Sequence, residues 1–460
     1  MKGRDVADKK QSLKIGISGV RGVIGDSLSP QLLVSFAEAF GSYVRGGKVL
    51  VATDTRTSKD MVKNAVFAGL LSSGCEPVDL GICPVPTILI RTKYAAASGG
   101  IAITASHNPS QWNALKFVNK NGLFLNANQA EELLDVYHQR EFYKCANSDM
   151  KKIRKDDGAI DFHMEKVLCR IDVDRIRSRK FKVAVDCCNG AASLVSPAFL
   201  ERLGCRVIPV NVEPNGIFPH DPEPIPANLK QISEVIRSKK ADIGFVQDAD
   251  ADRLAVVDEN GDPIGEEYTL VMAVDHILGK KKGPVVTNLS ATRAIDDIAE
   301  NHGCKVIRTR IGEINVVENI IEKKAVIGGE GNGGVIWPAV HPCRDSFSGM
   351  GIILEYLSGS DLKISGIARN LPSYHMVKGK TYCETAKAHL VVRKFKDLYR
   401  KDKPVLLDGV KVDFEGHWVH VRPSNTEPII RVIVEARTRK IAEQAYKKTM
   451  KDLAYLLKRS

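Results

Sequence analysis

The chain has 460 residues, a length that predicts two to four domains of ordinary size. Hydrophobic residues make up 43% and charged residues 27%, which provides enough apolar mass for packed cores and excludes a wholly disordered chain. No uninterrupted apolar run approaches the ~18 residues of a membrane span, and the first twelve residues lack the apolar centre of a signal peptide. We therefore expect a cytoplasmic protein without a membrane partner.

The basic residues outnumber the acidic ones by 67 to 55, so the net charge is +12. Such an excess attracts nucleic acid, anionic lipid or phosphorylated small molecules, although it is also compatible with solubility charge alone. Aromatic residues are only 6% and do not interleave with basic runs, which argues against a nucleic-acid partner. The ten cysteines include no C-x-x-C pair, so we expect a reducing compartment and no zinc site.

Strand, turn and helix patterns alternate through most of the chain. Strands are predicted at 48–53, 182–186 and 284–290, and helices follow at 59–71 and 293–302. These units lie ~100–130 residues apart, which favours three related α/β domains in tandem over one large α/β domain. Beyond residue 408 the pattern changes to alternating strands and a final helix, which predicts an α+β domain.

The predicted fold class is therefore α/β, with three tandem domains built on mixed sheets and a smaller α+β domain at the C-terminus. The C-terminal strands are predicted at 409–414, 418–422 and 429–434, before a helix at 440–458. The predicted domains are 1–160, 161–262, 263–372 and 373–460.

The first motif in chain order is a glycine-lined turn at 16–22 that carries Arg21. Its backbone can approach a ligand closely, and its guanidinium can bind a phosphate. The same pattern also suits an ordinary loop, so both interpretations stay open at this point.

The second motif is Thr104–Pro109, which follows a buried strand at 99–103. Ser106 stands at the tip of the strand, next to His107, where a hydroxyl is exposed as a nucleophile. A serine at such a turn is also common as the N-cap of a helix. Lys116 lies a short distance beyond the turn.

The third motif is Asp248-Ala249-Asp250-Ala251-Asp252-Arg253, between strands at 241–246 and 254–258. Three carboxylates at alternate positions with small spacers can turn toward one point, and Mg²⁺ prefers such an oxygen cage. The same triplet begins a calcium loop, but Arg253 stands where that loop requires glycine. A solvated acidic turn is the alternative without a metal.

Two further loops carry polar groups that suit hydroxyls in one case and a phosphate in the other. The glycine-rich run at 328–334 places Glu330 and Asn332 where an extended loop would point both toward vicinal hydroxyls. The run at 422–428 combines an arginine fork, hydroxyls and backbone N–H groups, with Arg431 just beyond, and so forms a potential phosphate cradle. A capped surface turn would have the same composition.

Together these motifs resemble those of the α-D-phosphohexomutase superfamily, in the same order and over essentially the whole chain. The segments that carry the resemblance are 18–22, 104–109, 248–253, 329–333 and 422–428. Within the superfamily, 329–334 and 112–116 are most similar to phosphoglucosamine mutases of the archaeal and Bacteroides-like type.

The resemblance implies four domains around a central cleft and a phosphoserine at Ser106. It implies that Asp248, Asp250 and Asp252 hold Mg²⁺ together with an oxygen of the phosphoserine. Arg21 and Lys116 match positions beside the phosphoserine. The residues implied to bind substrate are Glu330, Asn332, Arg253, Arg422, Ser424, Asn425, Thr426 and Arg431.

The implied reaction interconverts glucosamine 6-phosphate and glucosamine 1-phosphate through a sugar 1,6-bisphosphate, which also acts as the activator. The partner is then a phosphorylated hexose or hexosamine, and the chain is expected to be a monomer or homodimer. A phosphomannomutase or phosphoglucomutase with the same mechanism is the first alternative, because one amino or hydroxyl group changes little in a tolerant pocket. A sugar-phosphate hydrolase and a non-catalytic sugar-phosphate binder are the others.

The chain departs from the superfamily pattern at the sugar loop, where many members have a histidine and this chain has Gly334. His341 or Arg344, later in the same loop, are candidates to replace it. Lys116 and His107 are the remaining candidates for proton transfer.

Overall fold

The computed structural model describes residues 13–16, 19–424 and 428–459. The chain divides into two compact units: unit 1 runs up to residue 269 and includes 332–367, and unit 2 comprises 270–331 and the chain from 368 onward. In the described residues, no helix has both the length and the apolar character needed to cross a membrane.

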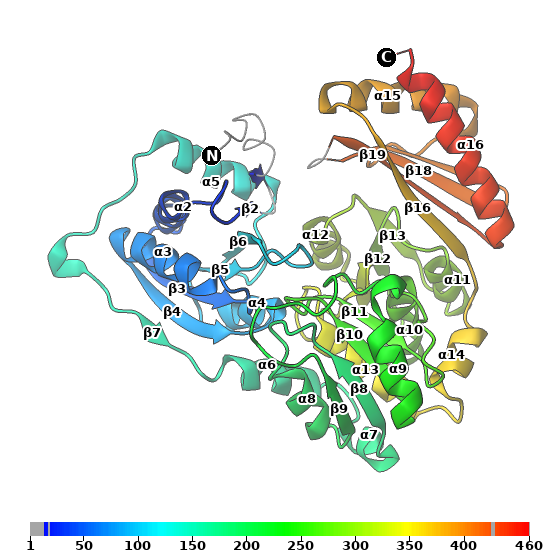
Figure 1. Cartoon of the computed structure of the whole chain (residues 1–460), viewed down its shortest axis with the longest axis horizontal. Helices are drawn as coiled ribbons and strands as arrows, with labels where there is room; N and C mark the ends of the chain where they lie inside the picture. Colours follow the sequence, from blue (N-terminus) through cyan, green and yellow to red (C-terminus); the bar gives the residue numbers. More distant parts are fainter. Residues whose placement is uncertain (1–12, 17–18, 425–427, 460) are drawn as a thin grey trace, which may run out of the picture. The chain divides into compact units, whose positions relative to one another are not determined.

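Unit 1 begins with a mixed sheet of seven strands in the order β1-β2-β6-β5-β3-β4-β7 (Figure 1). Strands β3, β4, β5 and β7 run parallel, whereas β6 is antiparallel to both β5 and β2. The strands are β1 (Lys14–Gly16), β2 (Gly19–Val23), β3 (Gly47–Thr53), β4 (Cys75–Ile82), β5 (Gly99–Ile103), β6 (Trp112–Asn119) and β7 (Arg154–Lys155). The helices are α2 (Pro30–Tyr43), α3 (Lys59–Ser72), α4 (Val85–Tyr94), α5 (Ala127–Gln139), η1 (Asn147–Asp149) and α6 (Ala159–Leu168).

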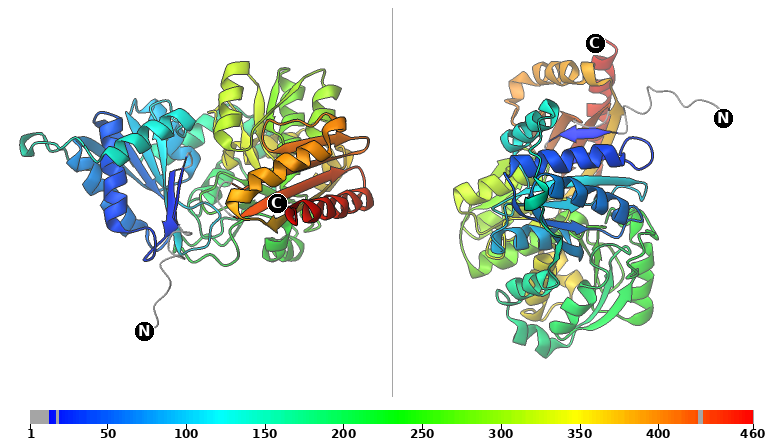
Figure 2. Two further views of the ribbon diagram at one scale, coloured as in Figure 1. Left: turned by 90° about the horizontal axis from the view of Figure 1, so that it is seen from above. Right: turned by 90° about the vertical axis from the view of Figure 1, so that its left-hand side faces the viewer.

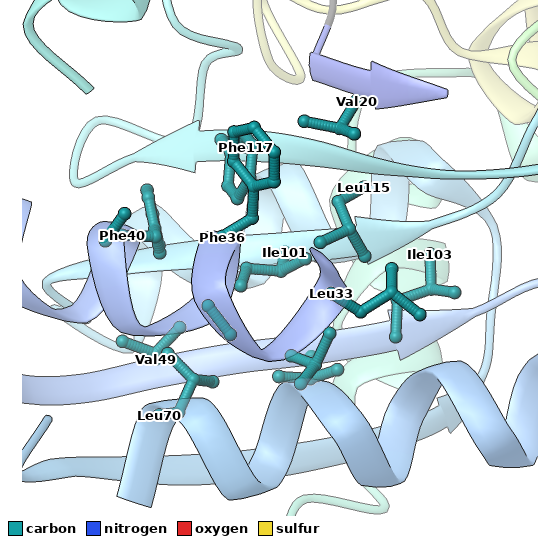
Figure 3. Packing of buried hydrophobic residues seen from close by; sticks show 14 of the residues in the cluster. Val20, Leu33, Phe36, Phe40, Val49, Leu70, Ile101, Ile103, Leu115 and Phe117 are labelled. Atoms are coloured by element: carbon teal, nitrogen blue, oxygen red, sulfur yellow. The ribbon is translucent and has the colours of Figure 1, made fainter. Parts of the chain in front are cut away.

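Alternation along β3 gives this sheet two buried faces. Val49 and Val51 pack with helices α2, α3 and α5, and Figure 3 shows Phe36 and Phe40 of α2 over this face. Leu50, from the same strand, packs on the opposite face with helix α4. Since successive side chains of a strand point to opposite faces, a continuous apolar strand such as β3 requires helices on both sides.

A second sheet of unit 1 has the order β11-β10-β8-β9, with β8, β9 and β10 parallel and β11 antiparallel to β10. Its strands are β8 (Lys182–Asp186), β9 (Arg206–Val210), β10 (Ile243–Gln247) and β11 (Leu254–Val257). The helical segments are α7 (Val173–Arg179), α8 (Ser196–Arg202), η2 (Pro226–Asn228) and α9 (Lys230–Lys239). The late segment of the unit contributes β15 (Gly334–Ile336), α13 (Ser346–Ser358) and the first residues of α14 (Ile364–Asn370), and α13 packs against α6, α7 and β11.

Unit 2 contains a parallel arrangement in which β12 pairs with both β13 and β14. These strands are β12 (Val285–Asn288), β13 (Val306–Thr309) and β14 (Ile327–Glu330), and their helices are α10 (Glu266–Lys280), which begins in unit 1, α11 (Ala294–Asn301) and α12 (Glu313–Lys323). The chain then forms a four-stranded antiparallel sheet in the order β16-β19-β18-β17.

The antiparallel sheet carries helices α15 and α16, which pack against it and against each other (Figure 2). Its elements are β16 (His375–Tyr382), α15 (Thr385–Leu398), η3 (Arg400–Asp402), β17 (Val410–Phe414), β18 (His417–Pro423), β19 (Ile429–Ala436) and α16 (Arg439–Leu457). The predicted fold class, α/β with an α+β C-terminal part, is confirmed. Strand β16 and helix α15 were not predicted from the sequence, and the four predicted domain boundaries stay predictions.

A buried lysine on β17 yields a prediction about stability. Lys411 is 4% exposed, and its Nζ lies 4.5 Å from the ring centroid of Trp418. Burial, with a further contribution from Arg308, lowers the pKa of Lys411 from 10.5 to about 8. At pH 7 the ammonium is protonated in both the folded and the unfolded chain, so folding bears the cost of burying it.

We expect Lys411→Met to increase the free energy of unfolding by roughly 1–3 kcal/mol at pH 7. The advantage should decline between pH 8 and about pH 10.5, because over that interval the buried lysine of the wild type has lost its proton while the unfolded lysine still holds one, so raising the pH favours the folded wild type. Thermal unfolding of both proteins across this range measures the effect, with the exposed Lys401→Met as a control. A variant less stable than the wild type at pH 7 would show that the ammonium–Trp418 contact outweighs the cost of burial.

Candidate active site

The acidic turn connects β10 to β11, whose antiparallel register places Gln247 opposite Leu254. Asp248, Asp250 and Asp252 are all buried, and one carboxylate oxygen from each lies within 4.8 Å of the others. Asp248 Oδ1 accepts the backbone N–H groups of Asp252 and Arg253 at 3.2 Å, which holds the turn closed. The predicted convergence of the three side chains is present in the structure.

Ser106 lies at the carboxyl end of β5 in unit 1, beside this turn, and it is buried, so the prediction of an exposed hydroxyl is wrong. Its Oγ donates to Asp248 Oδ2 at 3.0 Å and lies 3.4 Å from His107 Nδ1. The serine has a φ of 51°, in the left-handed region that non-glycine residues rarely occupy. The chain continues into strand β6 instead of a helix, so the alternative of a helix N-cap is wrong.

Four cationic side chains approach the three carboxylates. Lys116 Nζ on β6 is 2.7 Å from Asp250 Oδ2, and Arg344 Nη2 donates to Asp252 Oδ2 at 2.6 Å. Arg253 Nε lies 3.8 Å from both Asp248 and Asp252. The fourth, Arg21 on β2, donates through Nη1 to Asn108 Oδ1 at 2.7 Å and is close enough to Asp250 to interact with its charge. The site thus presents several guanidinium and ammonium donors around one hydroxyl, which suits a phosphoryl group.

Burial and mutual repulsion set the protonation of the triad. Burial and the neighbouring carboxylates raise the pKa of Asp248 well above its ordinary value. Burial also opposes the charge of Asp250, but the ion pair with Lys116 lowers its pKa below the usual range. Burial, with the charges of Arg253 and Arg21, lowers the pKa of His107 to about 2, so its imidazole is neutral near pH 7.

The donor set fits a hard divalent cation. Among the described residues, Oδ1 of Asp250 and Oδ1 of Asp252 are buried and accept no hydrogen bond. Buried carboxylate oxygens without partners are costly, and a cation with an all-oxygen preference would satisfy them. Asp248, Asp250 and Asp252 are therefore the residues of this turn that could hold a metal ion.

The glycine-rich loop lies at the boundary between the units, which falls between Gly331 and Asn332. Glu330, in unit 2, accepts Asn288 Nδ2 and the backbone N–H of Gly312, both at 3.0 Å. Asn332, in unit 1, accepts the backbone N–H of Gly334 at 3.2 Å. Their predicted joint contact with sugar hydroxyls stays a prediction.

His341 and Arg344, the two candidates to replace the histidine that many family members have at position 334, have different surroundings. A Cβ at Gly334 would lie 2.4 Å from Arg344 Cδ, so the arginine side chain fills the space above this glycine. Its guanidinium reaches the triad through Asp252. His341 is instead buried with its Nε2 2.7 Å from the carbonyl oxygen of Gly122.

The candidate phosphate loop of unit 2 lies between β18 and β19. The antiparallel register places Arg422 directly opposite Arg431, which brings together two arginines nine positions apart in the sequence. Arg422 Nη1 is 3.8 Å from Asp408 Oδ2, and the backbone N–H of Ser424 donates to Ile429 O at 2.9 Å. Asn425 and Thr426 lie outside the described residues, as does Ser18 of the N-terminal motif.

Two residues of the turn after β3 contact the Ser106 segment and were not identified as site residues in the sequence. Asp54 accepts Thr104 Oγ1 at 2.7 Å, and Arg56 donates to the carbonyl oxygen of Ser106 at 2.7 Å. A polar turn at the carboxyl end of a parallel strand was visible in the sequence. Its contact with a segment 50 residues away depends on the adjacency of β3 and β5 in the sheet.

Four sequence models of the phosphoglucomutase/phosphomannomutase family match the chain in order. Three describe its α/β/α domains I, II and III and match residues 12–144, 161–261 and 265–374, and the fourth describes its C-terminal domain and matches 381–451.

Full-length relatives carry two kinds of name. A protein of Thermococcus kodakarensis described as "phosphoglucomutase/phosphomannomutase" is 37% identical, over 96% of this chain and 99% of its own. A "probable phosphoglucosamine mutase" of Methanopyrus kandleri is 35% identical, over 93% of this chain and 95% of its own. A crystal structure of a phosphoglucomutase/phosphomannomutase family protein from Burkholderia thailandensis has the same fold, with a TM-score of 0.85 at 24% identity, over 96% of this chain and 98% of that one.

Proposed function

Because the chain belongs to the phosphoglucomutase/phosphomannomutase family and is thus a phosphohexomutase, we propose that it interconverts glucosamine 6-phosphate and glucosamine 1-phosphate. The enzyme is an intramolecular phosphotransferase of the isomerase class. The proposal for the amino sugar is supported by relatives described as probable phosphoglucosamine mutases, at 33–35% identity over nearly their whole length.

The observation that carries the mechanism is the contact of Ser106 Oγ with Asp248 Oδ2 at 3.0 Å, inside a ring of cationic side chains. We assign Ser106 as the residue that carries the phosphoryl group. In the first half-reaction, the phosphorus–Oγ bond breaks and a bond to a hydroxyl oxygen of the sugar monophosphate forms, and the proton of that hydroxyl must leave. In the second, the other phosphate of the 1,6-bisphosphate returns to Oγ, and the sugar oxygen that it leaves takes up a proton.

The residues around Ser106 have distinct proposed roles. Arg21 and Lys116 stabilise negative charge on the transferring group, and Arg253 binds the substrate. Neutral His107, 3.4 Å from Oγ, is the candidate for moving the proton. Asp248, Asp250 and Asp252, with an oxygen of the phosphoserine, would hold Mg²⁺, which would supply neutralisation of charge on the phosphoryl oxygens.

The proposed substrate ligands lie on the glycine-rich loop and on the loop between β18 and β19. Glu330 and Asn332 bind sugar hydroxyls, and Arg422, Ser424, Asn425, Thr426 and Arg431 bind the phosphate that does not react. The cross-strand placement of Arg422 and Arg431 supports the last assignment, because two arginines paired across neighbouring strands suit a dianion. The partner is therefore a phosphorylated hexose or hexosamine.

A phosphomannomutase or phosphoglucomutase activity is the second candidate, favoured by the name of the 37% identical relative. A ³¹P NMR panel separates the two. The protein, with Mg²⁺ and a trace of sugar 1,6-bisphosphate, receives the 6-phosphates of glucosamine, mannose and glucose in separate samples.

We expect the glucosamine compound to be converted to its 1-phosphate with the highest kcat/KM. Faster conversion of mannose or glucose 6-phosphate would retain the mechanism and reassign the substrate. Release of inorganic phosphate in place of isomerisation would show a hydrolase, and binding without turnover would show a non-catalytic binder. Either of these last outcomes would contradict the proposed function.

A further inference from the structure

The backbone around Ser106 is held by a buried arginine that has no role in the proposed chemistry. Arg56, in the turn after β3, is fully buried. Its Nη2 donates to the carbonyl oxygens of Ser106 at 2.7 Å and Asn108 at 2.6 Å, and its Nη1 donates to that of Pro109 at 2.7 Å. Three carbonyl groups of one short segment thus converge on a single guanidinium.

The same guanidinium is oriented by a buried carboxylate. Arg56 Nε donates to Asp54 Oδ2 at 3.0 Å, and the backbone N–H of Arg56 donates to Asp54 Oδ1 at 2.9 Å. Asp54 Oδ2 also accepts the hydroxyl of Thr104 at 2.7 Å, and the oxygen of that hydroxyl accepts the backbone N–H of Ser106 at 3.0 Å. The N–H and the C=O of Ser106 are therefore both connected to Asp54, the former through Thr104 and the latter through Arg56.

These contacts explain why Ser106 can hold its unusual backbone conformation. A non-glycine residue with φ near 51° is strained and persists only where its surroundings fix it. The fixed backbone in turn places Oγ 3.0 Å from Asp248 on the neighbouring sheet of unit 1. Lysine could not replace Arg56 here, because one ammonium cannot reach in the directions of a planar fork.

A loop of the second sheet covers this arginine. The ring of Phe218 lies with its centroid 5.0 Å from the guanidinium carbon of Arg56. Gly216, with a φ of 75°, lies so close that a Cβ would be 2.3 Å from the carbonyl oxygen of Thr55. The loop therefore packs directly on the turn and excludes water from one side of the guanidinium.

We propose that Arg56, oriented by Asp54, is a positioning residue for phosphoryl transfer: it fixes the Ser106 backbone so that Oγ stays aligned with the acidic turn. The inference rests on the proposed function, since it assigns Arg56 to the step in which Ser106 is phosphorylated. Arg56 contacts neither the carboxylates of the triad nor Oγ, so its effect is on the rate of transfer and not on metal or sugar binding.

The test compares Arg56→Lys with the wild type, using dephosphorylated protein and glucose 1,6-bisphosphate. Intact mass spectrometry at successive times gives the single-turnover rate of Ser106 phosphorylation, and steady-state assays give kcat and KM. We expect phosphorylation and kcat to fall about 100-fold, with KM for the sugar phosphate within about threefold of the wild type. The rise in Tm with Mg²⁺ should be retained.

Two further variants distinguish positioning from general stabilisation. Arg177→Lys loses donation to the carbonyl oxygen of Arg202, a main-chain contact that involves no site residue, and should phosphorylate at the wild-type rate. Arg56→Ala should recover part of its rate when millimolar guanidinium is added, whereas Arg177→Lys should not respond.

Phosphorylation of Arg56→Lys at the wild-type rate would overturn the inference. So would an equal loss in Arg177→Lys, or the disappearance of the Mg²⁺ response in Arg56→Lys, since both would indicate a general loss of structure. A wild type that fails to become phosphorylated would contradict the proposed function itself, which separates that failure from this one.

Discussion

Replacing Ser106 with alanine is expected to lower mutase activity by about 10³-fold or more, to the background of the assay. Oγ is the atom of this residue that can accept and return a phosphoryl group. It lies 3.0 Å from Oδ2 of Asp248 in the buried triad. Its removal should leave the fold nearly unchanged. The backbone contacts of residue 106 with Thr104 and Arg56 do not involve the side chain.

Two measurements check this expectation: conversion of the 6-phosphate by ³¹P NMR, and the mass of the intact protein after incubation with a sugar 1,6-bisphosphate. The wild type should gain one phosphoryl group, and Ser106→Ala should gain none. Ser358→Ala is a suitable control, because Ser358 is also buried and its hydroxyl donates within helix α13, to Glu355 O. Phosphorylation or turnover of Ser106→Ala at more than about a tenth of the wild-type rate would assign the phosphoryl carrier to another residue.

Replacing Asp248 with asparagine is expected to abolish the Mg²⁺ response and to lower kcat by about 10³-fold, while raising the Tm of the metal-free protein by a few degrees. The amide oxygen can still accept the backbone N–H groups of Asp252 and Arg253, so the turn should remain closed. The change removes one of three crowded, buried carboxylates, whose repulsion destabilises the metal-free fold. It also removes a negatively charged ligand, which a divalent cation requires.

Thermal unfolding with and without Mg²⁺ measures both effects. The wild type should gain stability with the ion by mass action, and the variant should not. Asp258→Asn is a closely matched control: Asp258 Oδ1 accepts the backbone N–H groups of Asn260 and Asp262 in the next turn, outside the triad. If Asp248→Asn still responds to Mg²⁺, the triad does not act as a cation site. If the variant is less stable than the wild type without metal, repulsion among the three carboxylates does not destabilise the metal-free fold.

Local sequence patterns predicted those parts of the fold that depend on neighbouring residues. Strand β3 is a continuous apolar run, and β8 and β19 are equally clear, so their positions were predicted to within one or two residues. Strand β16 was not predicted, because its residues alternate between exposed and half-buried positions and give no continuous apolar signal. Only the pairing with β19 makes it a strand.

The residues of the site also fall into those that local spacing predicts and those that depend on distant contacts. The Asp248–Asp252 triplet lies in one hairpin turn, so its convergence followed from spacing alone. Two other contacts could not be predicted from spacing, because they join distant parts of the chain. Arg56 donates to the carbonyl oxygen of Ser106, 50 residues away, and Arg344 donates to Asp252, 92 residues away. Pairs such as Arg422 and Arg431 are an intermediate case, since their meeting follows from the hairpin register.

The packing of Arg344 across Gly334 has a consequence for how sequences of this kind can diverge. Any side chain at position 334 would collide with the arginine stem and push its guanidinium away from Asp252. A descendant could therefore acquire a larger residue at 334 only after position 344 had become shorter, and the two sites should change together in an inherited order. A chimaera that combines a larger residue at 334 from one lineage with an arginine at 344 from another would place two side chains in the same space.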